Sequence, residues 1–151
     1  MKFGNLKLHS NKPTIIVEAG VNHNGDVKLA KRLIDVAADA GADLVKFQTL
    51  NADQMVTSKA TKAEYQLLTT NTLETQHEML KKLELSESAH RELIAYSAKR
   101  NIGFFSTGFD ISSINLLVSL NQELFKIPSG EITNLPYLRH IGQLAKTVII
   151  S

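Results

Sequence analysis

The feature that most constrains the fold of this chain is a regular alternation of short apolar runs with segments of helical periodicity. The runs cover residues 14–19, 44–48, 101–106, 124–127 and 148–150. The segments between them repeat apolar side chains every three or four residues, which predicts helices. The first run, Thr-Ile-Ile-Val-Glu-Ala, is continuously apolar up to its glutamate, which is typical of a strand covered on both faces of a parallel sheet. Strands that alternate with helices indicate a parallel α/β fold.

Polar residues at the carboxyl ends of the predicted strands favour a barrel over a doubly wound sheet. A barrel gathers all these ends around one mouth, whereas a doubly wound sheet binds ligands mainly at one switch point. We therefore predict the first half of a (β/α)8 TIM barrel, with four βα units plus a fifth strand and a short N-terminal β-hairpin. A complete barrel needs about 250 residues, so residues 1–151 are expected to form a single incomplete domain of a longer polypeptide. The polar residues at the strand ends are Glu18, Lys46, Gln48, Ser106, Thr107, Lys126, Ser129 and Ser151.

Composition excludes several classes of function. The formal net charge is +2, and no Lys/Arg cluster with interleaved aromatic residues is present, so we expect no nucleic-acid partner. The chain has no cysteine, which rules out disulfides and thiolate metal sites. The N-terminus lacks the apolar core of a secretory signal, and the longest uncharged stretch, 111–122, is too short to span a bilayer. We expect a cytoplasmic protein with no membrane partner.

Two lysines carry the strongest chemical signal. Lys126 interrupts the run 124–127, and Lys46 lies inside the run 44–48. A lysine is rarely buried without a partner. Two lysines at one barrel mouth would suit a multiply charged anion; alternatively, one could form a Schiff base with a pKa lowered by the other. Glu18 and Glu131 are either salt-bridge partners of these lysines or functional carboxylates.

The histidines do not suggest a metal site. His23 lies in a turn rich in Gly and Asn, residues 20–25, and has no second histidine at helical spacing. We interpret that turn as a conformational feature rather than a phosphate loop, because no Lys-Ser/Thr pair follows it. His90 and His140 fall on predicted helices as surface or packing residues.

Four motifs follow one another along the chain: Ile15–Gly25, Val45–Thr49, Phe105–Thr107 and Phe125–Pro136. Together, in this order and spacing, they resemble the N-acetylneuraminate (sialic acid) synthase family. The resemblance covers essentially the whole chain, and residues 62–66 also look like members that act on N-acetylmannosamine. It implies a TIM barrel followed by a small antifreeze-like domain, in a domain-swapped homodimer. It also implies condensation of phosphoenolpyruvate with N-acetylmannosamine to give N-acetylneuraminate and phosphate, with a divalent metal that is usually manganese.

The resemblance also implies roles for individual residues at the phosphoenolpyruvate site. Lys46 and Lys126 resemble the cationic groups that hold phosphoenolpyruvate. Thr107, Ser129 and Ser151 resemble hydrogen-bond donors to its phosphate and carboxylate.

Further roles concern the reacting centre and the sugar. Glu18 resembles the carboxylate beside the reacting carbon, and Glu131 a supporting carboxylate behind the lysines. Gln48 and Asn71 resemble contacts to the acylated sugar. Gly108 departs from the family, which commonly has proline there. The metal ligands are expected beyond residue 151, so this chain alone is expected to bind no catalytic metal tightly and to be inactive.

Three other functions remain open from the sequence. The first is a legionaminate or other nonulosonate synthase on the same scaffold. The second is a lysine Schiff-base aldolase. The third is a non-catalytic half-barrel that acts as a binding module.

Overall fold

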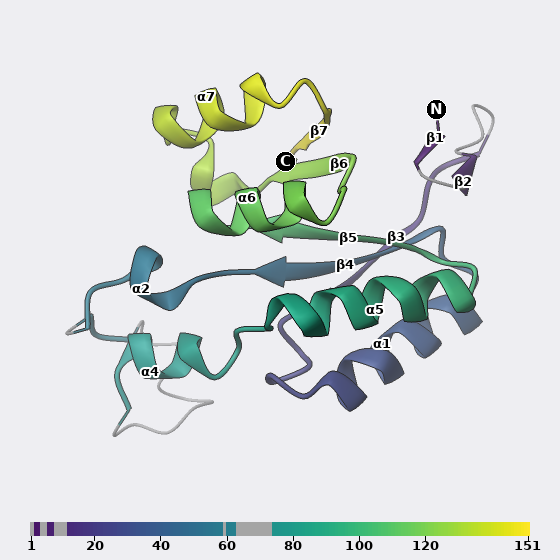
Figure 1. Ribbon diagram of the computed structural model, residues 1–151, viewed down its shortest axis with the longest axis horizontal. Coiled ribbons are helices and arrows are strands. Elements are labelled where there is room, and N and C mark those ends of the chain that lie inside the picture. Colours follow the sequence, from purple (N-terminus) through teal and green to yellow (C-terminus); the bar gives the residue numbers. More distant parts are fainter. Residues whose placement is uncertain (1, 4–5, 8–11, 59, 63–73) are drawn as a thin grey trace.

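Three parallel strands form the first part of the sheet. The computed structural model describes residues 2–3, 6–7, 12–58, 60–62 and 74–151 (Figure 1). Strands β3 (Ile16–Gly20), β4 (Leu44–Thr49) and β5 (Gly103–Gly108) lie in the order β3-β4-β5. In this register Glu18 lies opposite Lys46, and Gln48 lies opposite Thr107. The parallel α/β prediction is confirmed.

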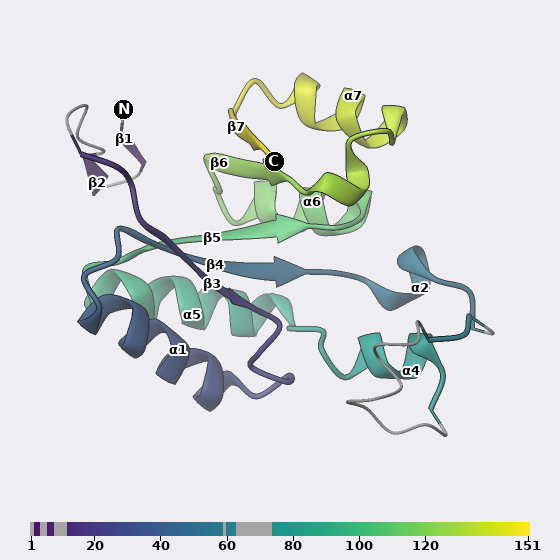
Figure 2. The same cartoon turned by 180° about the vertical axis from the view of Figure 1, so that it is seen from behind.

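Two helices cover one face of this sheet (Figures 1 and 2). Helix α1 (Val27–Asp39) begins at Asp26, whose carboxylate accepts from the backbone N–H groups of Lys28 and Leu29. Helix α5 (Glu87–Lys99) begins at Ser86, whose hydroxyl accepts from the N–H of Ala89. Such caps satisfy N–H groups that have no partner inside the helix. The core between helices and sheet includes Ala30, Ile34, Val45, Phe47 and Leu93.

The second part of the sheet contains two more parallel strands, β6 (Leu124–Ile127) and β7 (Thr147–Ile150). Helices α6 (Ile111–Ser119) and α7 (Leu135–Gln143) pack on it, and a 3-10 turn, η1 (Ser129–Glu131), follows β6. A second apolar cluster fills the space between these helices and strands. Its fully buried members are Ile114, Leu117, Phe125, Ile127, Tyr137 and Ile141.

A side chain joins the two parts of the sheet where a backbone ladder would normally run. The Gln122 amide oxygen accepts from the Ser106 N–H, and its amide nitrogen donates to the carbonyls of Ser106 and Leu124, each at 2.8 Å. Ser106 belongs to β5 and Leu124 opens β6. The amide of Gln122 therefore bridges β5 and β6.

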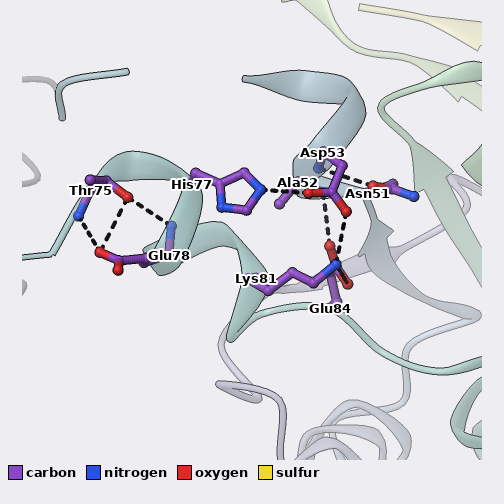
Figure 3. A network of polar contacts seen from close by, with 8 residues as sticks. All are labelled: Asn51, Ala52, Asp53, Thr75, His77, Glu78, Lys81 and Glu84. Atoms are coloured by element: carbon purple, nitrogen blue, oxygen red, sulfur yellow. Dashed lines mark hydrogen bonds and ion pairs between the residues drawn. The ribbon is translucent and has the colours of Figure 1, made fainter. Parts of the chain in front are cut away.

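The connection from β4 to α5 contains two short helices, α2 (Ala52–Met55) and α4 (Gln76–Lys81). Residues 49–72 follow the second predicted strand as a largely polar connection, and the helix α2 within it was not predicted. A polar network links the two helices (Figure 3): Asp53 accepts from His77 at 2.7 Å and from Lys81 at 3.1 Å, and Glu84 accepts from the Ala52 N–H. Both helices lie beyond the carboxyl end of β4 (Figure 2).

The predicted N-terminal hairpin is present as β1 (Lys2–Phe3) paired antiparallel with β2 (Leu6–Lys7). The alternation that predicted the hairpin begins at Leu6, so β1 lies earlier in the chain than expected, and residues 8–11 lie outside the described residues. Within the ranges that the structure describes, no helix is long and apolar enough to cross a membrane.

Candidate functional site

Strand alternation decides which side chains face the site. Successive residues of a strand point to opposite faces. On β4, Val45 and Phe47 pack under the helices, so Lys46 and Gln48 face the opposite, inner side. On β5, the same alternation places Phe105 and Thr107 on the inner side, opposite Lys46 and Gln48.

An ion pair lies at the centre of this inner face. Lys46 Nζ lies 2.8 Å from Glu18 Oε1 and 2.6 Å from Oε2. The lysine is only 4% exposed, whereas the Glu18 side chain is 50% exposed. Burial lowers the pKa of Lys46, the hydrogen bond and charge of Glu18 oppose that shift, and the charge of Lys126 adds to it. A buried ammonium group therefore faces the inner side with one half-exposed carboxylate as its counter-ion.

The second lysine lies within electrostatic reach of the first. Lys126 is half-buried on β6, and its charge lowers the pKa of Lys46. Its β6 neighbours Phe125 and Ile127 pack on the helix side, so alternation turns Lys126 inward. The two predicted cations share one face, and with Glu18 they leave an excess of positive charge that favours an anion.

Gly20 lets the backbone pass close to this group. Its φ is +56°, and a Cβ there would lie 3.2 Å from Glu18 Oε1 and 3.5 Å from Gln48 Nε2. A side chain would be strained in this conformation and would crowd both groups. The glycine thus brings Glu18 and Gln48 together beside Lys46.

Thr107 presents an unsatisfied hydroxyl on the same face. The residue is 1% exposed, and its Oγ1 has no hydrogen-bond partner within the described chain. An unpaired buried hydroxyl costs about 1–3 kcal/mol, so a ligand that accepts from it would recover that energy.

Gly108 replaces the family's usual proline without displacing Thr107 from the strand. Gly108 pairs with Thr49, and a Cβ there would lie only 3.0 Å from the Ile114 nitrogen of α6. Its carbonyl accepts from the Tyr137 hydroxyl at 2.7 Å, and burial raises the pKa of Tyr137 above its usual range. Because Gly108 has no side chain, α6 can pack close to β5.

The remaining predicted residues lie at the rim or outside the described residues. Ser129 and Ser151 are exposed, and the Ser151 N–H donates to Ile127 at 3.4 Å. Glu131 accepts from the Asn134 amide at 2.7 Å; in the described chain no ion pair joins it to either lysine. Asn71 lies outside the described residues.

The sequence missed a polar group on the other face of the same strands. Ser106 was placed at the mouth with Thr107, which was wrong, because alternation turns it toward the helices. There its hydroxyl contacts Thr49 at 2.7 Å, and Thr49 contacts His90 Nε2 at 2.8 Å. His90 is fully buried, so it is a packing residue rather than a surface one. The period-two alternation of β4 and β5 was the signal that identifies this group.

The described residues do not by themselves form a metal centre. They contain no group of three or more His, Cys, Asp or Glu side chains that could hold an ion. Glu18 is the carboxylate paired with Lys46, at 2.6 Å. These residues alone do not fit the implied manganese ion, and we derive no step through it.

A cavity of about 430 Å³ lies at the opposite, amino-terminal end of the strands. Helices α5 and α6 contribute apolar side chains such as Ile94 and Leu117. Phe105 lines it, but the polar inner-face residues do not, so it is separate from the site formed by Glu18, Lys46, Gln48, Thr107 and Lys126.

The chain is similar to several known synthases. The chain is 57% identical over 140 residues to an N,N'-diacetyllegionaminic acid synthase of Campylobacter jejuni, with 93% of this chain and 42% of that protein covered. It is 35% identical over 137 residues to the human N-acetylneuraminate-9-phosphate synthase, with 91% and 38% covered. The crystal structure of an N-acetylneuraminic acid synthetase from Leptospira borgpetersenii, in complex with citrate, superposes with a TM-score of 0.76 at 34% identity, with 99% and 48% covered.

The chain thus spans less than half the length of these relatives. The TM-score shows that the chain shares its fold with the Leptospira structure. The profile of the NeuB family matches residues 33–151, most of the 151 present. On this evidence the chain is a member of the NeuB family.

Proposed function

We propose that this chain is the N-terminal half of the TIM barrel of a nonulosonate synthase, which condenses phosphoenolpyruvate with an N-acylated sugar and releases phosphate. The observation that carries the proposal is the inner-face group: buried Lys46, half-buried Lys126 and the unpartnered hydroxyl of Thr107. These are two cations and a hydrogen-bond donor directed to one place. Family membership and the match to synthases support the same assignment.

The group suits phosphoenolpyruvate because that substrate carries a phosphate and a carboxylate. An ammonium group forms charge-assisted hydrogen bonds to such oxygens. The hydrogen bond and charge of Glu18 oppose the lowering of the Lys46 pKa by burial. When a bound anion replaces Glu18 as the ion-pair partner of Lys46, the Glu18 carboxylate is available to stabilise positive charge that develops at the reacting carbon.

The sugar is proposed to be a diacetamido hexose rather than N-acetylmannosamine. The chain is 57% and 50% identical to N,N'-diacetyllegionaminic acid synthases from Campylobacter jejuni and Legionella pneumophila, against 35% to the human N-acetylneuraminate-9-phosphate synthase. The Gln48 amide, which faces the site beside Gly20, would hydrogen-bond an acylamino group. The manganese ion, the homodimer and the cytoplasmic location stay predictions.

An isotope experiment on the full-length polypeptide tests the function. Phosphoenolpyruvate labelled with ¹⁸O in the C–O–P bridge is supplied with either sugar, and phosphate and keto acid are analysed by mass spectrometry. Cleavage of the C–O bond sends the label into phosphate, with faster turnover for the diacetamido sugar.

Three outcomes would contradict the proposal. Retention of the label in the organic product would exclude C–O cleavage. Borohydride trapping of pyruvate on Lys46 or Lys126 would indicate a Schiff-base aldolase instead. Binding of both substrates without turnover would favour a binding module.

A further inference from the structure

A continuous line of hydrogen bonds lies behind the inner face, between the sheet and α5. We call His90, Thr49, Ser106 and Gln122 the buried polar chain. Their exposed fractions are 0%, 5%, 0% and 9%. His90 Nε2 contacts Thr49 Oγ1 at 2.8 Å, Thr49 Oγ1 contacts Ser106 Oγ at 2.7 Å, and the backbone of Ser106 binds the Gln122 amide.

The direction of these hydrogen bonds is determined by one carbonyl. His90 Nδ1 lies 2.9 Å from the carbonyl oxygen of Ser86, which can only accept, so Nδ1 carries a proton. Burial lowers the pKa of His90 and keeps the ring neutral. Its Nε2 is therefore an acceptor, Thr49 donates to it, and Ser106 donates to Thr49.

Each hydroxyl of the buried polar chain adjoins an inner-face residue. Thr49 follows Gln48 on β4, and Ser106 precedes Thr107 on β5. The side chain of Ser106 is tied to β4 while its backbone is tied to Gln122. Rotation of either strand about its axis would break these bonds, so they fix the directions in which Gln48 and Thr107 point.

We propose that the buried polar chain is the positioning device of the substrate site, with His90, Thr49 and Ser106 as positioning residues that act through Thr107 on phosphoenolpyruvate and through Gln48 on the sugar. This inference rests on the proposed function. Within the described residues the buried Thr107 hydroxyl has no hydrogen-bond partner. A donor held in place before the ligand arrives needs no reorganisation on binding.

The test removes the central hydroxyl from the full-length polypeptide. Thr49→Val keeps the shape of the side chain and removes its hydroxyl, which donates to His90 and accepts from Ser106. Misplacement of a site by about 1 Å can cost about 100-fold, and here we expect the Kd of phosphoenolpyruvate to rise roughly 10-fold. The rise should appear in KM more than in kcat, and Thr49→Ser should restore binding. Titration calorimetry and steady-state kinetics measure both.

Ser97→Ala is the matched control, since Ser97 is 1% exposed and its hydroxyl has no partner within the described residues. It deletes a buried hydroxyl outside the chain and should leave the Kd unchanged. Ser106→Ala supplies a second variant if Thr49→Val does not fold. Binding by both variants equal to that of the wild type would overturn the positioning proposal.

A spectroscopic measurement separates this proposal from the proposed function. The ¹⁵N shifts of the His90 ring, assigned by comparison with His90→Gln, should report a neutral ring with its proton on Nδ1. A proton on Nε2 would reverse the hydrogen bonds and overturn the positioning proposal alone. A wild type that holds the Nδ1 proton yet binds no phosphoenolpyruvate would overturn the proposed function and the positioning role that rests on it.

Discussion

Replacing Gln122 by methionine tests whether one side-chain amide joins the two parts of the sheet. The substitution keeps an unbranched side chain of similar length and deletes all three hydrogen bonds of 2.8 Å. The Ser106 N–H and the carbonyls of Ser106 and Leu124 then lose these partners.

The expected cost follows from the number of groups left unpaired. Each buried polar group without a partner costs about 1–3 kcal/mol, so three give about 3–9 kcal/mol. Gln122 also lines the open cavity of about 430 Å³, through which water reaches the freed groups. We therefore expect the lower end, a loss of about 3 kcal/mol in the free energy of unfolding. That is a large share of the roughly 5–15 kcal/mol typical of a folded domain.

Urea unfolding followed by circular dichroism measures the change. Gln143→Met is the matched control, because Gln143 is exposed on α7 and such surface changes stay within about 0.5 kcal/mol. A Gln122→Met protein within about 0.5 kcal/mol of the control would refute the bridging role, since three unpaired buried groups cannot be that inexpensive.

Three other predictions concern the lysine, the histidines and a helix cap. Lys46→Met should weaken phosphoenolpyruvate binding about 10- to 150-fold, the loss of one charge-assisted hydrogen bond of about 1.5–3 kcal/mol; calorimetry that shows less than about twofold would contradict it. Burial lowers the pKa of His23 and His90, so the unfolded chain binds more protons once the pH falls below the ordinary value of about 6.5. The free energy of unfolding should be highest above that value and decrease as the pH falls from about 6.5 toward the lowered pKa values. The decrease should be shallower in His90→Gln. Urea midpoints that depend on pH identically in the wild type and in His90→Gln would count against this. Asp26→Ala should cost about 1 kcal/mol by loss of the cap on α1, and an unchanged thermal midpoint would show that the cap is dispensable.

Much of the fold was predictable because the relevant signals are local. Apolar runs fix strands, and Asp26 and Ser86 are caps that can be identified from sequence. The shared face of Lys46 and Gln48 follows from period-two alternation alone. These features need no knowledge of distant contacts.

The rest depends on contacts between segments far apart in the chain. Applied strictly, alternation would have turned Ser106 away from the mouth, but only the structure shows that it meets Thr49 and Gln122. The helix α2 is only four residues long, so its sequence shows little periodicity. It is held by contacts to α4, which the sequence of α2 does not reveal. His90 was not distinguishable from an ordinary helix residue until its buried partners were known.

The junction between β5 and β6 also has a mechanical consequence. Besides the Gln122 amide, the Tyr137 hydroxyl of α7 reaches the Gly108 carbonyl of β5, so side chains fasten the seam at two points. A backbone ladder holds two strands along their whole length. In the described chain this seam is held instead by these two hydrogen-bonded points and by the apolar cluster of Leu44, Phe105 and Leu124, which leaves the line along the seam as an axis of rotation. Lys46 lies on one side of that axis and Lys126 on the other. Small rotations about the seam would therefore change the separation of the two ammonium groups while both strands stay intact.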